Sequence, residues 1–182
     1  GTTVAMPYGG TYQETLMEGS VQTLPIIGAK DVETVSFASW GFDASHSSDN
    51  SLSGSALAVV ESVSKIVAMG GDYRTIRLSF QEYFEKLGQA PEKWGKPLSS
   101  LLGAYDAQMN FELAAIGGKD SMSGSFENLN VPPTLISFAC AHGEKKNVIS
   151  PEFKKADNYI YHFNHTLDKE GMPDYNSLKA VY

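Results

Sequence analysis

Two apolar runs separated by a long polar stretch constrain the fold more than any other feature of this sequence. The runs are residues 113–116 and 134–140, and the second one follows Pro132-Pro133. Apolar runs that are bounded by Gly and Pro and rich in β-branched and aromatic residues are typical of strands. A hairpin needs only about 2–5 residues to turn. The sequence therefore predicts two strands joined by a loop that is much longer than a turn.

The polar stretch begins with a group of residues suited to phosphate binding, Gly117, Gly118, Lys119, Asp120 and Ser121. Unpaired backbone N–H groups in a Gly/Ser loop beside a lysine can hold a phosphate. The spacing matches neither a Walker motif nor GxGxxG. The alternative is a solvated loop whose glycines only adopt positive φ. The residues by themselves leave both interpretations open.

Strand and helix patterns alternate before this stretch. Residues 34–42 and 72–84 alternate as strands do, and residues 54–69 have the period of a helix. Pro97 is expected to open a second helix. This order predicts an α+β fold with helices covering one face of a sheet. The side chains expected to face the core are Ala56, Val59, Val60, Val63 and Val67 on the first helix, and Leu98, Leu101, Leu102, Tyr105 and Met109 on the second.

Net charge and cysteine content limit the class of protein. A net charge of −7 argues against a surface for nucleic acid or for an anionic membrane. Cys140 is the only cysteine and lies in an apolar run, which predicts a buried residue in a reducing cytoplasm. No apolar run approaches the roughly 20 residues that span a bilayer, and no signal peptide opens the chain. We therefore expect a cytoplasmic protein that binds neither nucleic acid nor membrane.

Three longer strings resemble the phosphoribosylformylglycinamidine synthase family. They are GTYQETLMEGSV, Tyr105-Asp106-Ala107, and GGKDSMSGSFE followed by VPPTLISFA. They are most similar to the second of two related N-terminal-type domains of the aminoimidazole-ribonucleotide synthetase superfamily. Within that superfamily the string GKDSM is specific to this family. The resemblance covers about residues 6–182 and is strongest over 36–141.

The resemblance implies a fold and a domain division. It implies a chorismate-mutase-like, ferredoxin-related four-stranded sheet with helices on one face, and sheets of this kind pair face to face. An isolated copy is therefore expected to expose an apolar sheet face and to form a homodimer. Residues 1–143 would form this domain. Residues 144–182 would be a linker and the truncated start of a nucleotide-binding C-terminal-type domain, and the chain is expected to be an excised piece of a longer polypeptide.

The resemblance also implies an activity for the parent enzyme. Members convert formylglycinamide ribonucleotide, ATP and glutamine into the formylglycinamidine, as ATP-dependent ligases with glutamine as the amide donor. ATP or ADP and Mg²⁺ are the implied cofactors, and the remaining domains of the enzyme are the implied partners. The glutaminase triad and the ETHNHP-like catalytic string are missing from this sequence. We therefore predict no catalytic residue here, and a chain that is inactive alone.

Two glutamates are the magnesium ligands that the resemblance implies. Glu18 falls on a family position that is more often Asp. Glu61 falls on a ligand position of a helix, and in family members an asparagine follows that ligand four residues later. Here that second position is Lys65, which would either weaken the metal site or itself meet a phosphate. Without the resemblance, Glu18 is an ordinary surface residue and Glu61 pairs with Lys65 for about 0.3–0.5 kcal/mol.

Three interpretations of the function remain open. In the first, the loop at 117–121 binds a phosphate in the active site. In the second, the chain is a structural and dimerisation scaffold beside a nucleotide that is not turned over. In the third, the match to GKDSM is accidental and the chain belongs to a different superfamily ligase.

Overall fold

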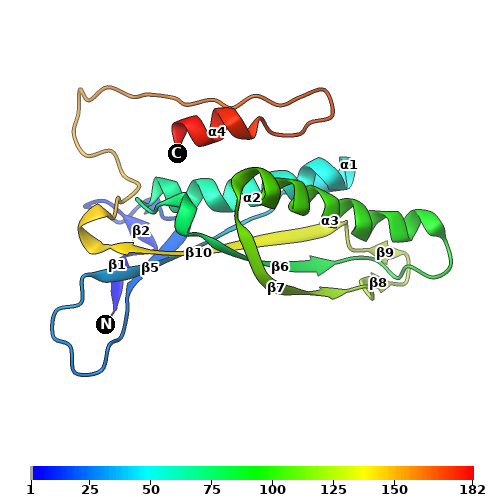
Figure 1. Ribbon diagram of the computed structural model, residues 1–182, viewed down its shortest axis with the longest axis horizontal. Coiled ribbons are helices and arrows are strands. Elements are labelled where there is room, and N and C mark those ends of the chain that lie inside the picture. Colours follow the sequence, from blue (N-terminus) through cyan, green and yellow to red (C-terminus); the bar gives the residue numbers. More distant parts are fainter. Residues whose placement is uncertain (1) are drawn as a thin grey trace.

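A mixed six-stranded sheet forms one layer of the structure, and helices cover one of its faces (Figure 1). The computed structural model describes residues 2–182. All neighbouring strands pair antiparallel except β6 and β7, which are parallel. In spatial order the strands are β1 (Thr3–Ala5), β4 (Gly19–Thr23), β5 (Thr34–Gly41), β10 (Thr134–Glu144), β6 (Arg77–Tyr83) and β7 (Ala114–Ser121).

The predicted α+β class is confirmed, but the sheet has six strands where four were expected. The four expected strands are β5, β10, β6 and β7, and they are consecutive neighbours in the sheet. The N-terminal segment supplies the other two, because β4 pairs with β5 and β1 pairs with β4. The sheet therefore extends beyond the expected set at one edge only.

The long loop predicted after residue 116 is largely regular structure. β7 continues to Ser121, so the Gly-Gly-Lys-Asp-Ser group lies in a strand. The connection to β10 contains a small hairpin of β8 (Ser125–Phe126) and β9 (Leu129–Asn130). A second small ladder joins β2 (Tyr8–Gly9) to β3 (Thr15–Leu16). The group at 117–121 thus has the fixed geometry of a sheet edge.

The central helix α2 (Ser51–Ala68) packs on the sheet after the short helix α1 (Ala44–Asp49). It begins after Asn50, whose side chain caps the helix by accepting hydrogen bonds from the N–H groups of Leu52 and Ser53. α2 is long and apolar enough to cross a membrane by length and composition. More than half of it is buried in this fold, which accounts for its apolar character.

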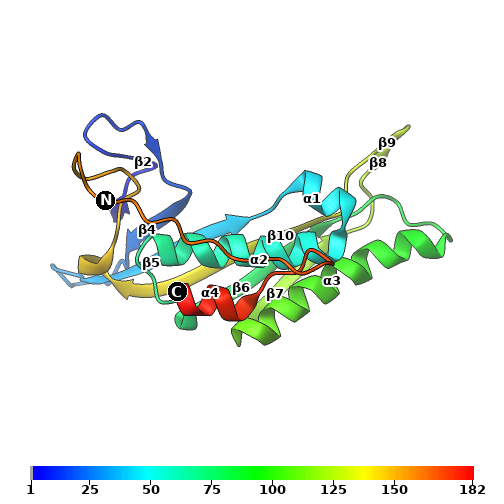
Figure 2. The same ribbon diagram turned by 90° about the horizontal axis from the view of Figure 1, so that it is seen from above.

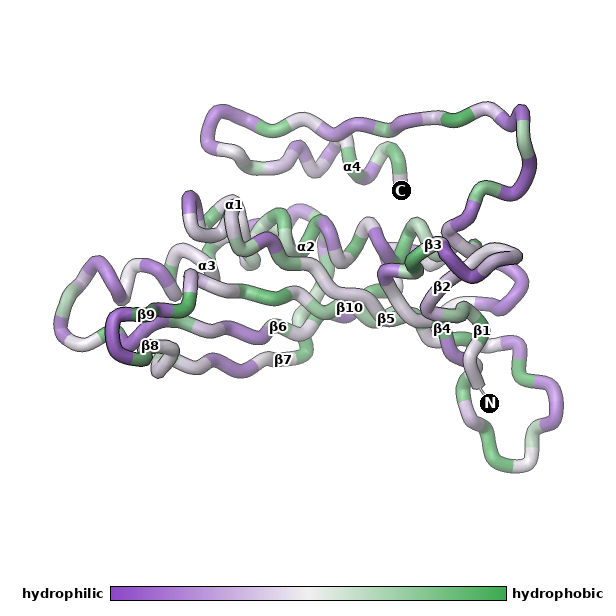
Figure 3. The backbone as a smooth tube through the Cα atoms, turned by 180° about the vertical axis from the view of Figure 1, so that it is seen from behind, coloured by the Kyte–Doolittle hydropathy of each residue, from purple (hydrophilic) through white to green (hydrophobic). Residues whose placement is uncertain are grey.

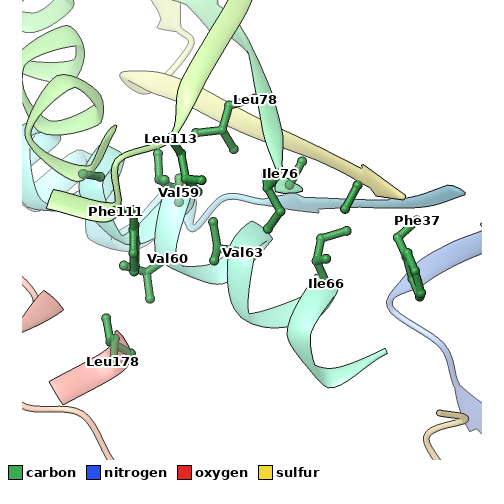
Figure 4. Close-up of a cluster of buried hydrophobic side chains, with 14 of the residues drawn as sticks. Phe37, Val59, Val60, Val63, Ile66, Ile76, Leu78, Phe111, Leu113 and Leu178 are labelled. Carbon is green, nitrogen blue, oxygen red and sulfur yellow. The ribbon is translucent and has the colours of Figure 1, made fainter. Parts of the chain in front are cut away.

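The core lies between α2 and the sheet, as Figure 4 shows. Figure 3 shows the corresponding hydrophobic segments along α2 and the central strands. Full burial of an aliphatic or aromatic side chain stabilises a fold by about 1.5–3 kcal/mol, and four of the five predicted α2 positions are buried, with Val67 only partly so. The fully buried side chains labelled in the close-up include Phe37, Val59, Val63, Ile66, Ile76 and Leu78.

The second long helix, α3 (Pro91–Phe111), presents the opposite face from the one predicted, and it begins six residues earlier. Its buried positions are mostly small, including Ser100, Gly103, Ala104 and Ala107. A side chain at Gly103 would overlap the carbonyl oxygen of Leu52 on α2, so small residues are required where the helices approach closely. The predicted stripe is instead exposed, with Leu98, Leu101, Leu102, Tyr105 and Met109 each 49–59% accessible.

Cys140 is exposed, contrary to the prediction that it is buried. Side chains alternate along β10, and the neighbours Ala139 and Ala141 point to the helix-covered face. Cys140 therefore lies on the open face of the sheet, beside Ala38 of β5 in the strand register.

The C-terminal segment folds back over the helices. After the turn η2 (Lys145–Asn147) it runs above α2 and ends in α4 (Tyr175–Val181), as Figures 1 and 2 show. Tyr175 is buried, and its ring lies edge-on to the ring of Phe111 with the two centroids 5.1 Å apart. The sequence YIYHF at 159–163 alternates as a strand does, but those residues are exposed and pair with no strand in the described chain.

Candidate functional site

The predicted binding residues form two groups at different parts of the sheet. Glu18 directly precedes β4, whereas residues 117–121 end the edge strand β7. Three strands, β5, β10 and β6, lie between β4 and β7. At about 4.8 Å per strand, β4 and β7 are roughly 19 Å apart. The glutamates and Lys119 therefore do not share one site within this chain.

The first group brings Glu18 and Glu61 together around one lysine. The Nζ atom of Lys65 lies 3.0 Å from Oε2 of Glu18 and 2.6 Å from Oε1 of Glu61. Glu61 lies one helical turn before Lys65 on α2, which is the spacing at which side chains meet. The backbone N–H of Phe42 donates to the other oxygen of Glu61 at 2.9 Å. Both oxygens of Glu61 are thus already bonded.

The Lys65 ammonium is held in its charged form. Its side chain is only 15% exposed, and Nζ lies 4.9 Å from the centroid of the Trp40 ring, where a cation is attracted to the π face. Burial lowers the pKa of Lys65, but hydrogen bonds to Glu61 and Glu18 outweigh burial. The net result is a pKa above the ordinary lysine value.

These residues do not fit magnesium in the arrangement observed. Mg²⁺ requires near-octahedral oxygen ligands at close range, and an ammonium already lies between the two carboxylates. Residues 2–182 contain no group of three or more His, Cys, Asp and Glu side chains that could hold a metal. Magnesium binding by Glu18 and Glu61 stays a prediction, and it requires Lys65 to move away.

The second group lies along the edge strand β7. In register with β6, Gly118 lies beside Phe80, Lys119 beside Gln81 and Asp120 beside Glu82. Successive side chains of a strand point to opposite faces, so Lys119 and Asp120 cannot both face one ligand on the same side. An edge strand also has backbone N–H and C=O groups that no neighbouring strand pairs. The unpaired N–H groups are the backbone donors available for an anion.

Lys119 lies on the open face of the sheet. Its Nζ atom is 4.1 Å from the centroid of the Tyr83 ring on β6. No ion pair joins Lys119 to a carboxylate in the part of the chain that the structure describes. Its positive charge is therefore available to a ligand at the edge of the sheet.

Glu82 is a candidate functional residue that the sequence analysis missed. It is 7% exposed, and its Oε1 atom is buried without a hydrogen-bond partner. Burial raises the pKa of Glu82 to about 7, with a smaller contribution from the charge of Asp120. The signal for it was present in the sequence. Glu82 continues the alternation of Leu78 and Phe80, which puts a carboxyl group on the buried face of a strand.

A cleft of about 620 Å³ lies between α3 and β7. Glu82 and Asp120 line it from the two parallel strands, and Leu101, Tyr105 and Ile116 provide much of its apolar wall. The cleft is therefore acidic at one side and apolar at the other. It lies on the face of the sheet opposite the Lys119 ammonium.

Solved structures resemble this chain, although no protein-family model and no curated protein sequence matches it. PurLQS from Thermotoga maritima is 16% identical with a TM-score of 0.66, over 83% of this chain and 23% of that one. T. maritima PurL complexed with FGAR is 15% identical with a TM-score of 0.65, over 83% and 22%. T. maritima PurL complexed with ATP is 16% identical with a TM-score of 0.65, over 84% of this chain and 23% of that one. The chain therefore spans less than a quarter of the length of these proteins. The structural similarity confirms the resemblance at the level of the fold.

Proposed function

We propose that this chain is a part of a phosphoribosylformylglycinamidine synthase, corresponding to its second aminoimidazole-ribonucleotide-synthetase-like N-terminal-type domain. The observation that carries the proposal is the common fold with PurL over 83% of the chain, together with the GKDSM string, residues 118–122, at the end of β7. The PurL structures were obtained with FGAR, with ATP and with ADP. The parent enzyme would be an ATP-dependent carbon–nitrogen ligase of purine biosynthesis that uses glutamine as the amide donor.

In this proposal the edge of β7 holds a phosphate of the nucleotide or ribonucleotide. Lys119 supplies positive charge, and Gly117, Gly118 and Ser121 supply N–H and hydroxyl donors. Oriented donors and cations of this kind stabilise the charge of a transferring phosphoryl group. Asp120 lies on the opposite face and would touch a ribose hydroxyl or a different ligand. The phosphate would therefore approach from the open face of the sheet.

The isolated chain is proposed to make no product. We expect the catalytic residues and the glutaminase to lie in other domains of the parent enzyme. Magnesium, where the parent enzyme uses it, would need Glu18 and Glu61 freed from Lys65. The chain's own contribution would be to bind and orient phosphate, while other domains complete the active site.

Two exposed apolar surfaces support a role within a larger assembly. One is the open face of the sheet, which includes Ala38, Trp40 and Cys140. The other is the outward stripe of α3 described above. Exposed apolar patches of this kind mark interaction sites. The remaining domains of a cytoplasmic parent enzyme, or a second copy of the chain, would cover them, and residues 144–182 would lead into the next domain.

The Lys65 arrangement favours a second candidate function. The ammonium lies between the two carboxylates and takes one oxygen of each, and the other oxygen of Glu61 accepts from the N–H of Phe42. Carboxylates that are occupied by a lysine are expected in a structural domain beside a nucleotide that is not turned over. In that case the domain would function by stabilising the enzyme and by forming a dimer.

Substitution of Lys119→Ala in the complete enzyme distinguishes the two candidates. Release of ADP is followed in a coupled assay, and thermal melting is measured on the same samples. Loss of turnover with unchanged melting supports a phosphate role in the working site. Lowered melting with near-normal turnover supports the structural role. Lys155→Ala is the matched control, because Lys155 is exposed in the C-terminal segment.

A further inference from the structure

Glu82 provides the starting point because it is a buried carboxyl group. One of its carboxyl oxygens has no hydrogen-bond partner, and only 7% of the residue is exposed. A buried polar atom without a partner costs about 1–3 kcal/mol, so a fold retains one where something else supplies the partner. The same carboxyl group lines the cleft between α3 and β7, where a ligand could do so.

The charge around this carboxyl group is negative. Asp120 is its neighbour in the strand register and lines the same cleft. The other titratable groups that line the cleft are Tyr105 on α3 and Lys119 on β7. The Lys119 ammonium is over the Tyr83 ring and pairs with neither carboxyl group. A ligand with a positive group would therefore meet two carboxylates that have no ion-pair partner among residues 2–182.

The remaining walls are apolar and the space is large enough for a small molecule. Leu101, Tyr105 and Ile116 contribute to the wall, and all three are 49–78% exposed. Small-molecule sites typically measure about 300–1,000 Å³ and combine apolar walls with a few convergent polar groups. The cleft, at about 620 Å³, has these properties.

We infer that the cleft between α3 and β7 binds a small organic cation, in which an amidinium, guanidinium or ammonium group meets Glu82 and Asp120 and an apolar body lies against α3. A planar amidinium or guanidinium suits a carboxylate because it donates two parallel N–H bonds. An anion such as phosphate is repelled from this face. The inference does not depend on the proposed phosphate site, since that site lies on the opposite face of the sheet.

Binding of such a cation must depend on the ionisation of Glu82. Its pKa of about 7 means that the carboxyl group is largely neutral at pH 6 and largely charged at pH 8. The affinity for a permanent cation is therefore expected to rise about tenfold between these pH values. Asp120, Lys119 and Tyr105 remain in place when only Glu82 is changed, so a variant at Glu82 isolates its contribution.

The experiment uses benzamidine as the probe and benzamide as its neutral counterpart of the same shape. Each is titrated into ¹⁵N-labelled protein at pH 6 and pH 8, and the amide signals of α3, β6 and β7 are followed by NMR. We expect saturable benzamidine binding that shifts signals around the cleft and strengthens about tenfold at pH 8. Benzamide is expected to bind at least tenfold more weakly at pH 8.

Two variants make the inference falsifiable. Glu82→Gln keeps the shape of the side chain and is expected to lower benzamidine affinity at least tenfold at pH 8 and to abolish its pH dependence. Glu92→Gln replaces an exposed residue of α3, the helix that borders the cleft. It is expected to change neither the benzamidine affinity nor its pH dependence. Equal binding of benzamidine and benzamide, or full affinity in a folded Glu82→Gln protein, would overturn the inference. Failure of benzamidine to bind the wild-type chain would overturn it as well.

Discussion

The ammonium nitrogen of Lys65 lies 2.6 Å from a carboxylate oxygen of Glu61, one helical turn earlier on α2. The same nitrogen reaches Glu18, which precedes β4, at 3.0 Å. One lysine thus joins the central helix to the N-terminal part of the sheet. The two carboxylates that the family resemblance assigns to magnesium hold a protein cation in this chain.

Replacement of Lys65 by asparagine is expected to create a metal site. Without the ammonium, two adjacent carboxylates and an amide oxygen form the oxygen-rich set that suits Mg²⁺ and Mn²⁺. We predict weak or undetectable Mn²⁺ binding by the wild-type chain and at least tenfold tighter binding by Lys65→Asn, measured by electron paramagnetic resonance. The double variant Lys65→Asn with Glu61→Gln should lose this gain. Tight Mn²⁺ binding by the wild type would show that Lys65 yields to metal.

Two glycines of α3 are expected to respond in opposite ways to the same substitution. A side chain at Gly103 would overlap the Leu52 carbonyl oxygen, whereas nothing lies near the corresponding position at Gly95. Gly103→Ala should therefore destabilise the fold by roughly 1–3 kcal/mol through overpacking. Gly95→Ala should stabilise it by about 0.5–1 kcal/mol, because alanine favours the helix. Urea unfolding of both variants measures the difference, and equal effects would refute the close approach of α2 and α3.

The open face of the sheet is expected to mediate self-association. Ala38 and Cys140 are adjacent on this face, and a glutamate at position 38 would place a charge in the middle of a paired sheet interface. We predict that sedimentation velocity finds a wild-type dimer and that Ala38→Glu dissociates it. Leu101→Glu on the exposed stripe of α3 serves as the control and should leave the dimer intact. Dissociation by Leu101→Glu alone would assign the interface to α3.

Stability is expected to fall as pH rises between about 4.5 and 7. The pKa of Glu82 is raised from 4.5 to about 7 in the folded chain, so the folded state binds more protons than the unfolded state in that interval. The stabilising contribution of this group, roughly 3 kcal/mol, is therefore fully present below the lower pKa and is lost as the pH rises through the upper one. Unfolding curves at pH 5 and pH 8 should show this loss in the wild type and a smaller one in Glu82→Gln. Identical pH dependence in both proteins would contradict the assignment.

Sequence periodicity predicted the central part of the fold well. The four expected strands and the helix at 54–69 form as anticipated, because alternation and a three-to-four-residue period report directly on burial in a two-layer fold. The apolar stripe predicted for α3 failed for a physical reason. Close approach to α2 requires a glycine at Gly103, so the leucines lie outside. Hydrophobicity alone does not reveal this preference for a small residue.

The site was predictable only in part. Sequence spacing gave the Glu61–Lys65 pair, but the approach of Glu18 from β4 depends on strand pairing over a long sequence distance. Gly117 and Gly118 indicated a loop, whereas pairing with β6 makes them an edge strand. Cys140 lies in an apolar run but points to the open face, because the face that a strand residue occupies depends on which side the helices cover.

The central claim is that the edge of β7 binds phosphate through Lys119, and an NMR titration with ADP tests it most directly. Amide signals of ¹⁵N-labelled wild-type, Lys119→Ala and Lys155→Ala proteins are followed as ADP is added, with and without Mg²⁺. The account predicts saturable shifts at Gly117, Gly118, Lys119 and Ser121, with affinity at least tenfold lower in Lys119→Ala, about 1.4 kcal/mol, and unchanged in Lys155→Ala. Shifts confined to other parts of the chain, or equal affinity in all three proteins, would contradict it.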